Sequence, residues 1–249
     1  MITLKSAQEI AFMRQAGRIV AETLQELGKR ISPGVTTGEL NKFAEDFIRE
    51  AGGVPAFLNY QGFPASICAS VNNEVVHGIP GLRILENGDI ISIDVGAFYH
   101  GYCGDSACTF PVGEISAEAE RLLAVTKKSL EMGIEKAVSG NRIGDIGAAI
   151  QTFVEDNGFS VVRAFVGHGI GQEMHEAPQV PNFGRPGYGP RLEPGMTLAI
   201  EPMVNAGTYD VAIMPNKWTV VTKDGSLSAH FEHSILVTGG QPEILTRLS

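Results

Sequence analysis

The chain has 249 residues, of which 43% are hydrophobic and 19% are charged, and its formal net charge at pH 7 is −9. This length and apolar content suit one soluble globular domain over residues 1–249 with a sizeable core. The acidic balance disfavours a broad nucleic-acid surface, and no apolar run approaches the roughly 20 residues of a membrane helix.

Two amphipathic helices are predicted at the start of the chain. The first covers about residues 6–28, and the spacing of Ser6 and Glu9 is that of a capping box. Charged residues interrupt this helix, so we do not interpret it as a signal peptide. The second covers about residues 37–51, where apolar side chains recur at helical spacing.

A β-rich stretch follows over residues 57–112, with turns predicted at residues 62–64, 79–81 and 87–88. Within it, eleven positions separate Asp94 from Asp105. That interval is enough for one strand, a turn at residues 99–101 and a return strand. We therefore predict a hairpin that directs both carboxylates to one place.

The second part of the chain repeats the order of helices followed by strands. Helices are predicted at about residues 116–138 and 143–157, and strands at residues 160–166, 197–202, 219–222 and 232–237. This order favours an α+β fold with antiparallel pairing over a Rossmann sheet. The sequence also lacks the Gly-x-Gly-x-x-Gly and P-loop motifs of nucleotide-binding folds.

An internal repeat relates the two parts. Residues 85–94 match residues 192–201 at a constant offset of 107, so Asp94 and Glu201 occupy equivalent positions. A repeat this long is far above the period of solenoids. We expect two similar halves, about residues 1–113 and 114–249, that pack as one body.

Five residues with metal-binding side chains end or flank apolar, strand-like runs. They are Asp94, Asp105, His168, Glu201 and Glu232. Charged groups in such places are costly unless they are paired or bind a cation. Four carboxylates and one imidazole form an oxygen-rich set that suits Mn(II), Fe(II) or Co(II), with Zn(II) and Ni(II) as further candidates. Two divalent ions would balance the four carboxylates and leave a water that ionises near neutral pH.

The three cysteines lack the spacing of a zinc ribbon or a redox pair. They are Cys68, Cys103 and Cys108, and their odd number argues against a disulfide framework. A reducing cytoplasm is the simplest interpretation.

Six short motifs lie in order along the chain: ISIDVG at residues 91–96, GD at 104–105, GHGIG at 167–171, HEAP at 175–178, IEP at 200–202 and FEH at 231–233. Together they resemble type I methionine aminopeptidase over essentially the whole chain. The resemblance implies a pita-bread fold, with two pseudo-symmetric halves and antiparallel sheet flanked by helices. It also implies one catalytic domain that removes the initiator methionine from nascent proteins whose second residue is small.

The resemblance further implies a cytoplasmic monomer whose substrate is a peptide or nascent-chain N-terminus. The N-terminal zinc-binding extension of some relatives is not expected here, so a transient ribosome contact would use the catalytic body. In the family pattern Asp94 chelates one metal, Asp105 and Glu232 bridge both, and His168 with Glu201 completes the other. In the same family pattern, a metal-bridging hydroxide would attack the scissile carbonyl. Glu201 would take the proton from the attacking water and transfer it to the leaving amine.

The same pattern gives roles to residues outside the ligand set. His175 would hydrogen-bond the scissile carbonyl or its oxyanion, and His77 would contact the substrate backbone. The methionine pocket would be lined by Tyr60, Phe63, Cys68 and Trp218, with Phe57 and Met174 at neighbouring positions. Phe57 and Met174 depart from the pattern, because a smaller residue and an aromatic residue are more usual there.

Other functions fit parts of the pattern. Prolidase and aminopeptidase P resemble the same fold, but they normally carry an extra N-terminal domain, and the first capped helix here begins near Ser6. A type II methionine aminopeptidase needs a helical insertion, and only 31 positions separate Glu201 from Glu232. A binding scaffold that has lost its metals should lack a ligand, and none of the five is missing. The remaining histidines, His100, His230 and His233, match no motif and are interpreted as structural or supporting residues.

Overall fold

The computed structural model describes residues 2–248. This part of the chain contains the four predicted helices: α1 (Ala7–Gly28), α2 (Thr37–Glu50), α3 (Ala117–Glu135) and α4 (Ile143–Asp156). Ser6 and Glu9 form the predicted capping box, in which the Ser6 backbone N–H donates to the Glu9 carboxylate at 2.7 Å. Each helix begins and ends within three residues of its predicted bounds.

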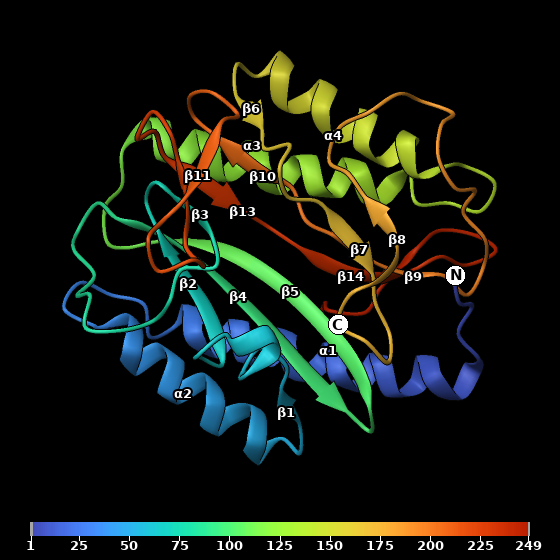
Figure 1. The fold of residues 1–249 in the computed structure, drawn as a ribbon, viewed down its shortest axis with the longest axis horizontal. Coiled ribbons are helices and arrows are strands. Elements are labelled where there is room, and N and C mark those ends of the chain that lie inside the picture. The colour runs from blue at the N-terminus through green and yellow to red at the C-terminus, as the bar shows by residue number, and fades with distance from the viewer. Residues whose placement is uncertain (1, 249) are drawn as a thin grey trace.

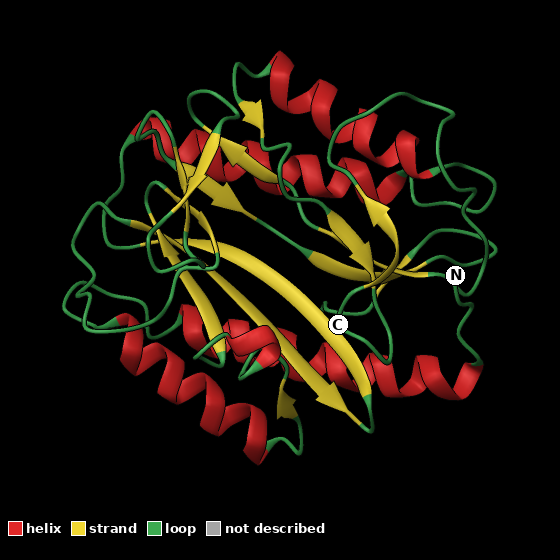
Figure 2. Ribbon diagram, in the orientation of Figure 1, coloured by secondary structure: helices red, strands yellow, loops and turns green. Residues whose placement is uncertain are grey.

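The strands lie between the two pairs of helices, with α1 and α2 on one side and α3 and α4 on the other (Figures 1 and 2). They are β1 (Val54–Pro55), β2 (Ile67–Val71), β3 (Glu74–Val76), β4 (Ile90–Tyr99), β5 (Tyr102–Pro111), β6 (Ser160–Val161), β7 (Gly167–Gly169), β8 (Glu176–Val180), β9 (Thr197–Ile200), β10 (Met203–Asn205), β11 (Val211–Ile213), β12 (Val220–Thr222), β13 (Ser228–His230), β14 (His233–Leu236) and β15 (Glu243–Ile244). A 3-10 turn, η1 (Tyr60–Gly62), precedes β2.

All pairings between these strands are antiparallel. One sheet has the order β1-β4-β2 with β5 also on β4, and another has the order β15-β14-β9-β7-β8. Two three-stranded sheets, β13-β10-β6 and β11-β12-β3, complete the set. The predicted α+β fold with antiparallel pairing is therefore confirmed.

The long hairpin of β4 and β5 is the most regular part of the molecule. Its strands pair residue by residue from Ile90 opposite Pro111 to Tyr99 opposite Tyr102. The turn between them uses positive φ angles at positions 100 and 101. Apolar side chains on one face of β4 pack with those of α1 and α2 into a core. The hairpin predicted from the spacing of Asp94 and Asp105 is confirmed.

A seam of hydrogen bonds joins β5 to the segment just before and within β14. Glu232 N donates to Ala107 O at 2.9 Å, and Ser106 Oγ donates to Glu232 O at 2.5 Å. The Ser234 hydroxyl accepts from Asp105 N at 3.0 Å and donates to Asp105 O at 2.8 Å. This seam fixes the backbones of Asp105 and Glu232 beside each other.

The strand predicted at residues 160–166 is wrong for most of its length. Only β6 forms there, and β7 begins after a gap of five residues. β6 pairs with β10 whereas β7 pairs with β9 in a different sheet, so the chain between them has to cross from one sheet to the other. The short strands β7, β8, β10, β11, β13 and β15 were not predicted.

No helix within residues 2–248 is both long enough and apolar enough to cross a membrane.

Candidate metal centre and adjoining pocket

The hairpin directs two carboxylates to one face of the sheet. Asp94 lies opposite Ala107 and Asp105 lies opposite Gly96, so the two aspartates are diagonal neighbours on adjacent strands. Side chains two positions apart on a strand share a face, which places both carboxylates on the same side.

The other three metal-binding side chains come from the five-stranded sheet. His168 is the middle residue of β7, Glu201 follows β9 directly and Glu232 precedes β14 directly. The register of β9 and β14 places Ile200 opposite His233, so the next residues outward, Glu201 and Glu232, meet at the end of this strand pair. Strand register therefore gathers residues that lie far apart in the sequence.

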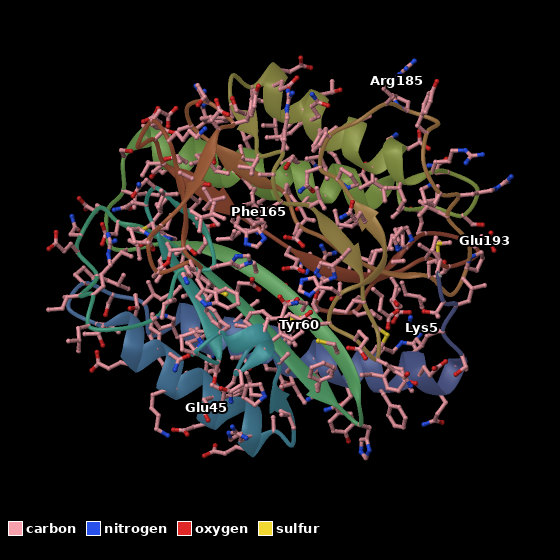
Figure 3. All side chains as sticks on the ribbon, in the orientation of Figure 1. Lys5, Glu45, Tyr60, Phe165, Arg185 and Glu193 are labelled. Atoms are coloured by element: carbon pink, nitrogen blue, oxygen red, sulfur yellow. The ribbon has the colours of Figure 1, made fainter. Side chains whose placement is uncertain are left out.

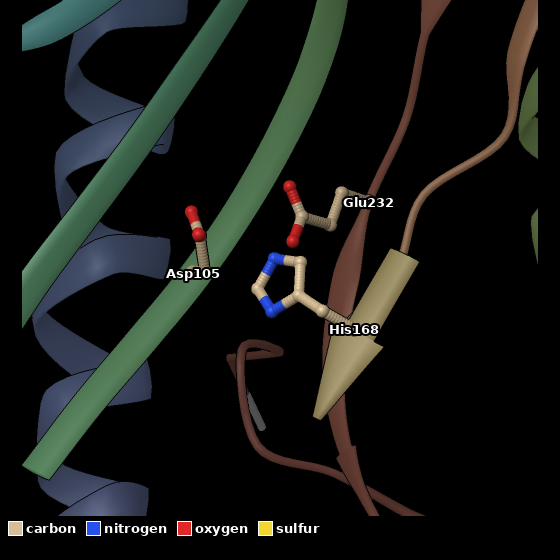
Figure 4. Close-up of side chains that lie close together, drawn as sticks. All are labelled: Asp105, His168 and Glu232. Carbon is tan, nitrogen blue, oxygen red and sulfur yellow. The ribbon is translucent and has the colours of Figure 1, made fainter. Parts of the chain in front are cut away.

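Three of these side chains can contribute donor atoms to one cation. Asp105, His168 and Glu232 are buried, and one ligand atom from each lies within 4.8 Å of the others (Figure 4). His168 Nε2 is also 3.5 Å from Glu201 Oε1. His168 Nδ1 lies 2.9 Å from Gly169 O, a contact that requires a proton on Nδ1 and leaves the Nε2 lone pair for a metal.

Several oxygens in the cluster are buried with no hydrogen-bond partner in the described chain. They are Asp94 Oδ1, Asp105 Oδ1 and Glu232 Oε1. Buried carboxylate oxygens without donors are costly, and a bound cation removes that cost. The residues present therefore fit hard divalent cations, which prefer oxygen donors with some imidazole.

Burial and mutual repulsion also disturb the protonation of the cluster. Burial raises the pKa of Asp94 to about 7. Burial, and then repulsion between neighbouring carboxylates, raises the pKa of Asp105, Glu201 and Glu232 well above the usual range. Burial lowers the pKa of His168 to about 4, so this imidazole is neutral near pH 7. A divalent cation would stabilise the charged carboxylates.

A cavity of about 320 Å³ opens beside these carboxylates. Its lining contains every residue that the sequence analysis assigned to the site: Tyr60, Phe63, Cys68, His77, Asp94, Asp105, His168, His175, Glu201, Trp218 and Glu232. Phe57 and Met174 also line it. A Cβ at Gly96 would lie 2.6 Å from Phe57 Cε1, so the large Phe57 side chain fits because the facing residue is glycine.

Two neutral histidines face this cavity. Tyr60 Oη lies 2.9 Å from His175 Nδ1, and the His175 and His168 ring centroids are 4.2 Å apart. Burial lowers the pKa of His175 below its usual value. His77 packs edge-on against Phe165, and burial lowers its pKa to about 4. Each ring can therefore donate a hydrogen bond without carrying a charge.

Two further residues border the site without having been predicted to do so. Gln61 lines the cavity with a φ of 49°, a left-handed conformation that is uncommon for residues other than glycine. His230 is fully buried, and its Nε2 has no hydrogen-bond partner and lies 3.8 Å from Glu201 Oε2. Its position two residues before Glu232 was the available sequence signal, because alternate residues of an extended segment share a face.

The other two histidines lie away from the cavity. His100 is in the hairpin turn and stacks on Phe12 with ring centroids 5.0 Å apart. His233 Nδ1 lies 2.9 Å from Thr246 Oγ1 near the end of the chain. Both contacts agree with the interpretation of these residues as structural.

The sequence profile of metallopeptidase family M24 matches residues 11–239. The chain is 58% identical over 247 residues to a methionine aminopeptidase from Clostridium acetobutylicum, with 99% of both chains covered. It is 56% identical to methionine aminopeptidase 1 of Bacillus subtilis, with 100% of both covered. Among solved structures, a methionine aminopeptidase from Thermotoga maritima superposes with a TM-score of 0.98 at 46% identity, again over 100% of both chains.

Proposed function

The chain belongs to metallopeptidase family M24 and, within it, to the methionine aminopeptidases, and we propose that it hydrolyses the peptide bond after an N-terminal methionine in the cavity described above. The fold is the pita-bread fold, as predicted. The observation that carries the proposal is the group of unpartnered carboxylate oxygens beside a pocket with apolar and aromatic walls. Its substrates would be nascent proteins whose second residue is small.

The residues that would hold metal are Asp94, Asp105, His168, Glu201 and Glu232. Two divalent ions are proposed, drawn from Mn(II), Fe(II) and Co(II) with Zn(II) and Ni(II) as weaker candidates, because two such ions balance four carboxylate charges. When bound, such ions polarise the scissile carbonyl and lower the pKa of a coordinated water toward neutrality.

Glu201 is proposed to move the proton during hydrolysis. Its carboxylate would take a proton from the attacking water and pass it to the nitrogen of the departing peptide. In the metal-free protein, burial and then the neighbouring carboxylates raise the pKa of Glu201 well above its usual range.

His175 is proposed to donate a hydrogen bond to the scissile carbonyl as negative charge develops on it. If the Tyr60 hydroxyl donates to His175 Nδ1, the ring proton is fixed on Nε2 and available to the substrate. A preorganised donor of this kind contributes about 3 kcal/mol to transition-state stabilisation. His77, from the loop after β3, is proposed to hold the substrate backbone near the scissile bond.

The cavity wall is proposed to select methionine. Phe63 and Trp218 meet edge to face with ring centroids 5.1 Å apart, and the buried Cys68 lies in the same wall. Aromatic rings and sulfur make favourable contacts with a thioether. Met174 occupies a neighbouring position and adds a flexible, polarizable wall.

We also propose that residues 1–249 act as one catalytic domain with two related halves, about 1–113 and 114–249, since both halves contribute side chains to the cavity. A cytoplasmic location is proposed because Cys68, Cys103 and Cys108 are all free thiols. The working form is proposed to be a monomer that makes a transient ribosome contact through the catalytic body.

The test is release of free methionine from a Met-Ala-Ser peptide by metal-stripped protein under anaerobic conditions. Mn(II), Fe(II), Co(II) and Zn(II) would be titrated separately, with an Ala-Pro peptide in parallel. Metal-dependent cleavage of Met-Ala-Ser alone is the expected result. Cleavage of Ala-Pro would instead indicate a proline-directed peptidase, and metal binding without cleavage of either peptide would indicate a scaffold.

A further inference from the structure

We propose that Lys5 is a positioning residue for His175: it holds the loop that carries His175 from outside the cavity, so that the segment before α1 is part of the catalytic apparatus. The inference rests on the proposed role of His175 in peptide hydrolysis. The loop in question, here called the histidine loop, covers residues 170–175 between β7 and β8.

Lys5 forms a largely buried ion pair with the residue that follows the histidine loop. Lys5 Nζ lies 2.6 Å from Glu176 Oε2, and the two side chains are 5% and 16% exposed. In the ion pairs that other Lys and Arg side chains form within residues 2–248, the cationic side chain is at least 43% exposed. Exposed pairs of that kind contribute little, whereas removing one partner of a buried pair leaves an uncompensated charge.

Further hydrogen bonds, from the Thr3 side chain and from the Lys5 backbone, fix the segment that carries Lys5. Thr3 Oγ1 donates to Glu176 Oε2 at 3.0 Å, and Lys5 Nζ also donates to Thr3 Oγ1 at 2.7 Å. The Lys5 backbone N–H donates to Gly195 O at 2.8 Å, in the turn before β9. Figure 3 labels Lys5 close to the start of α1. Contacts other than the one with Glu176 therefore also fix the position of the Lys5 ammonium.

Glu176 transmits this restraint into the loop. Its second oxygen, Oε1, accepts from Glu173 N at 3.3 Å, and Gly171 N donates to Glu173 O at 3.0 Å. The Lys5 stem packs against the loop as well, because a Cβ at Gly171 would lie 2.3 Å from Lys5 Cε. His175 directly precedes Glu176 in the chain, so a restraint on Glu176 limits how far the backbone of His175 can move.

A second contact holds the other end of the histidine loop. Gln172 Nε2 donates to Tyr102 Oη at 2.8 Å, and Tyr102 Oη donates to Glu9 Oε1 at 2.7 Å. Cys103 N donates to Gly171 O at 2.8 Å. These contacts tie the start of the loop to β5 and α1. The end that carries His175 is held by the contacts of Lys5, Thr3 and Glu173 with Glu176, and by the contact of Tyr60 with His175.

Lys5→Met and Glu176→Gln test this inference, with Arg14→Met as the matched control. Arg14 also joins α1 to a distant segment, through two hydrogen bonds to Glu243 at 2.6 and 2.8 Å, but this pair is exposed and does not contact the loop. We expect Lys5→Met and Glu176→Gln to lower kcat for Met-Ala-Ser by about 10- to 100-fold, as a misplacement near 1 Å can. KM and metal content should stay within about twofold, since the ligand residues are untouched.

Two further measurements separate positioning from a general structural role. Amide hydrogen exchange at residues 171–176 should accelerate in Lys5→Met and stay unchanged in Arg14→Met, in both cases with metal bound. In a His175→Ala background, Lys5→Met should cause no further loss of kcat, because Lys5 acts through His175.

Multiplicative losses in that double variant, or unchanged kcat and loop exchange in Lys5→Met, would overturn the inference. An equal loss in Arg14→Met would overturn it too. If the wild-type protein failed to cleave Met-Ala-Ser, the proposed function would fail, while the hydrogen-exchange comparison would still report whether Lys5 orders the loop.

Discussion

The two sides of the metal centre are built differently. On the hairpin side, Asp94 and Asp105 lie within two strands of ten residues each, paired along their whole length. On the short-strand side, His168 lies in a strand of three residues, and Glu201 and Glu232 lie just outside strands of four. The group proposed to hydrogen-bond the substrate carbonyl, His175, and the group proposed to transfer the proton of the attacking water, Glu201, belong to the short-strand side.

The two sides differ in how each functional side chain is held in position. A continuous ladder fixes a ligand through backbone hydrogen bonds that no single side chain controls. A strand end or a loop depends instead on individual side-chain contacts, such as Lys5 with Glu176 and Tyr60 with His175. We infer that substitutions on the hairpin side act through metal binding, whereas substitutions around the loops change turnover.

Asp105→Asn should have the largest effect. This substitution replaces a negatively charged, buried metal ligand with a neutral amide. We therefore expect kcat to fall about a thousandfold, which is equivalent to about 4 kcal/mol. Metal content by elemental analysis should fall with it. Asp46→Asn, which changes an exposed carboxylate on α2, is the control and should leave both unchanged. An active, metal-replete Asp105→Asn protein would contradict the proposed ligand role.

His175→Ala should lower kcat by about a hundredfold or more, because a preorganised donor to the oxyanion is lost. Metal content should stay at the wild-type level, which would separate the two sides of the centre experimentally. His100→Ala, in the hairpin turn, serves as the control. A collapse of metal occupancy in His175→Ala would identify His175 as a ligand and remove the distinction.

Metal removal should make folding stability depend on pH. The carboxyl pKa values are raised in the folded protein, to about 7 for Asp94 and well above the usual range for Asp105, Glu201 and Glu232. Protonated carboxyl groups therefore favour the folded state. Their contribution to stability is complete below the pKa values of the unfolded chain, near 4, and is lost as the pH rises through the pKa values of the folded protein.

Buried histidines oppose this trend at lower pH. Burial lowers the pKa values of His77, His168 and His233 to about 4, and that of His230 to about 3. Between these pKa values and pH 6.5, the four histidines stabilise the folded state increasingly as the pH rises. Above pH 6.5 the histidine effect levels off and the carboxyl effect continues. The midpoint of thermal unfolding in chelator should therefore decline from pH 6.5 to 8.5 relative to protein saturated with Mn(II). Parallel profiles would show that burial and neighbouring charges do not raise the carboxyl pKa values in the metal-free protein.

Tyr60→Phe should have the smallest effect. It removes one hydrogen bond to His175 Nδ1, worth about 1 kcal/mol, and we expect kcat to fall about fivefold with little change in KM. Tyr188→Phe, at an exposed tyrosine, is the matched control. An unchanged kcat would mean that Tyr60 does not set the tautomer of His175.

Much of this arrangement could be predicted because its signals are local. The capping box of Ser6 and Glu9 and the turn between Asp94 and Asp105 each depend on residues a few positions apart. The repeat that equates Asp94 with Glu201 added a long-range relation, because it compares the sequence with itself. The five metal-binding residues lie in short motifs, whereas the pocket residues Tyr60, Phe63, Cys68 and Trp218 came from the family resemblance.

The features that could not be predicted depend on register between distant segments. β7, β10 and β13 have three residues each, too few to show an alternating pattern. The partner of Lys5 lies 171 positions away and has no local signature. His230 matched no motif, and its proximity to Glu201 appears only once β10 and β13 are paired.

The placement of the metal-binding residues on two separate sheets gives the metal a second role. Asp94 and Glu232 are 138 positions apart in the sequence, so an ion held by both would act as a cross-link that closes a loop of that length. In the chain-entropy description of disulfides, closing such a loop stabilises the folded state by about 5 kcal/mol. Metal supply would then set the lifetime of the protein as well as its turnover, because the metal-free chain would unfold, and be degraded, more readily.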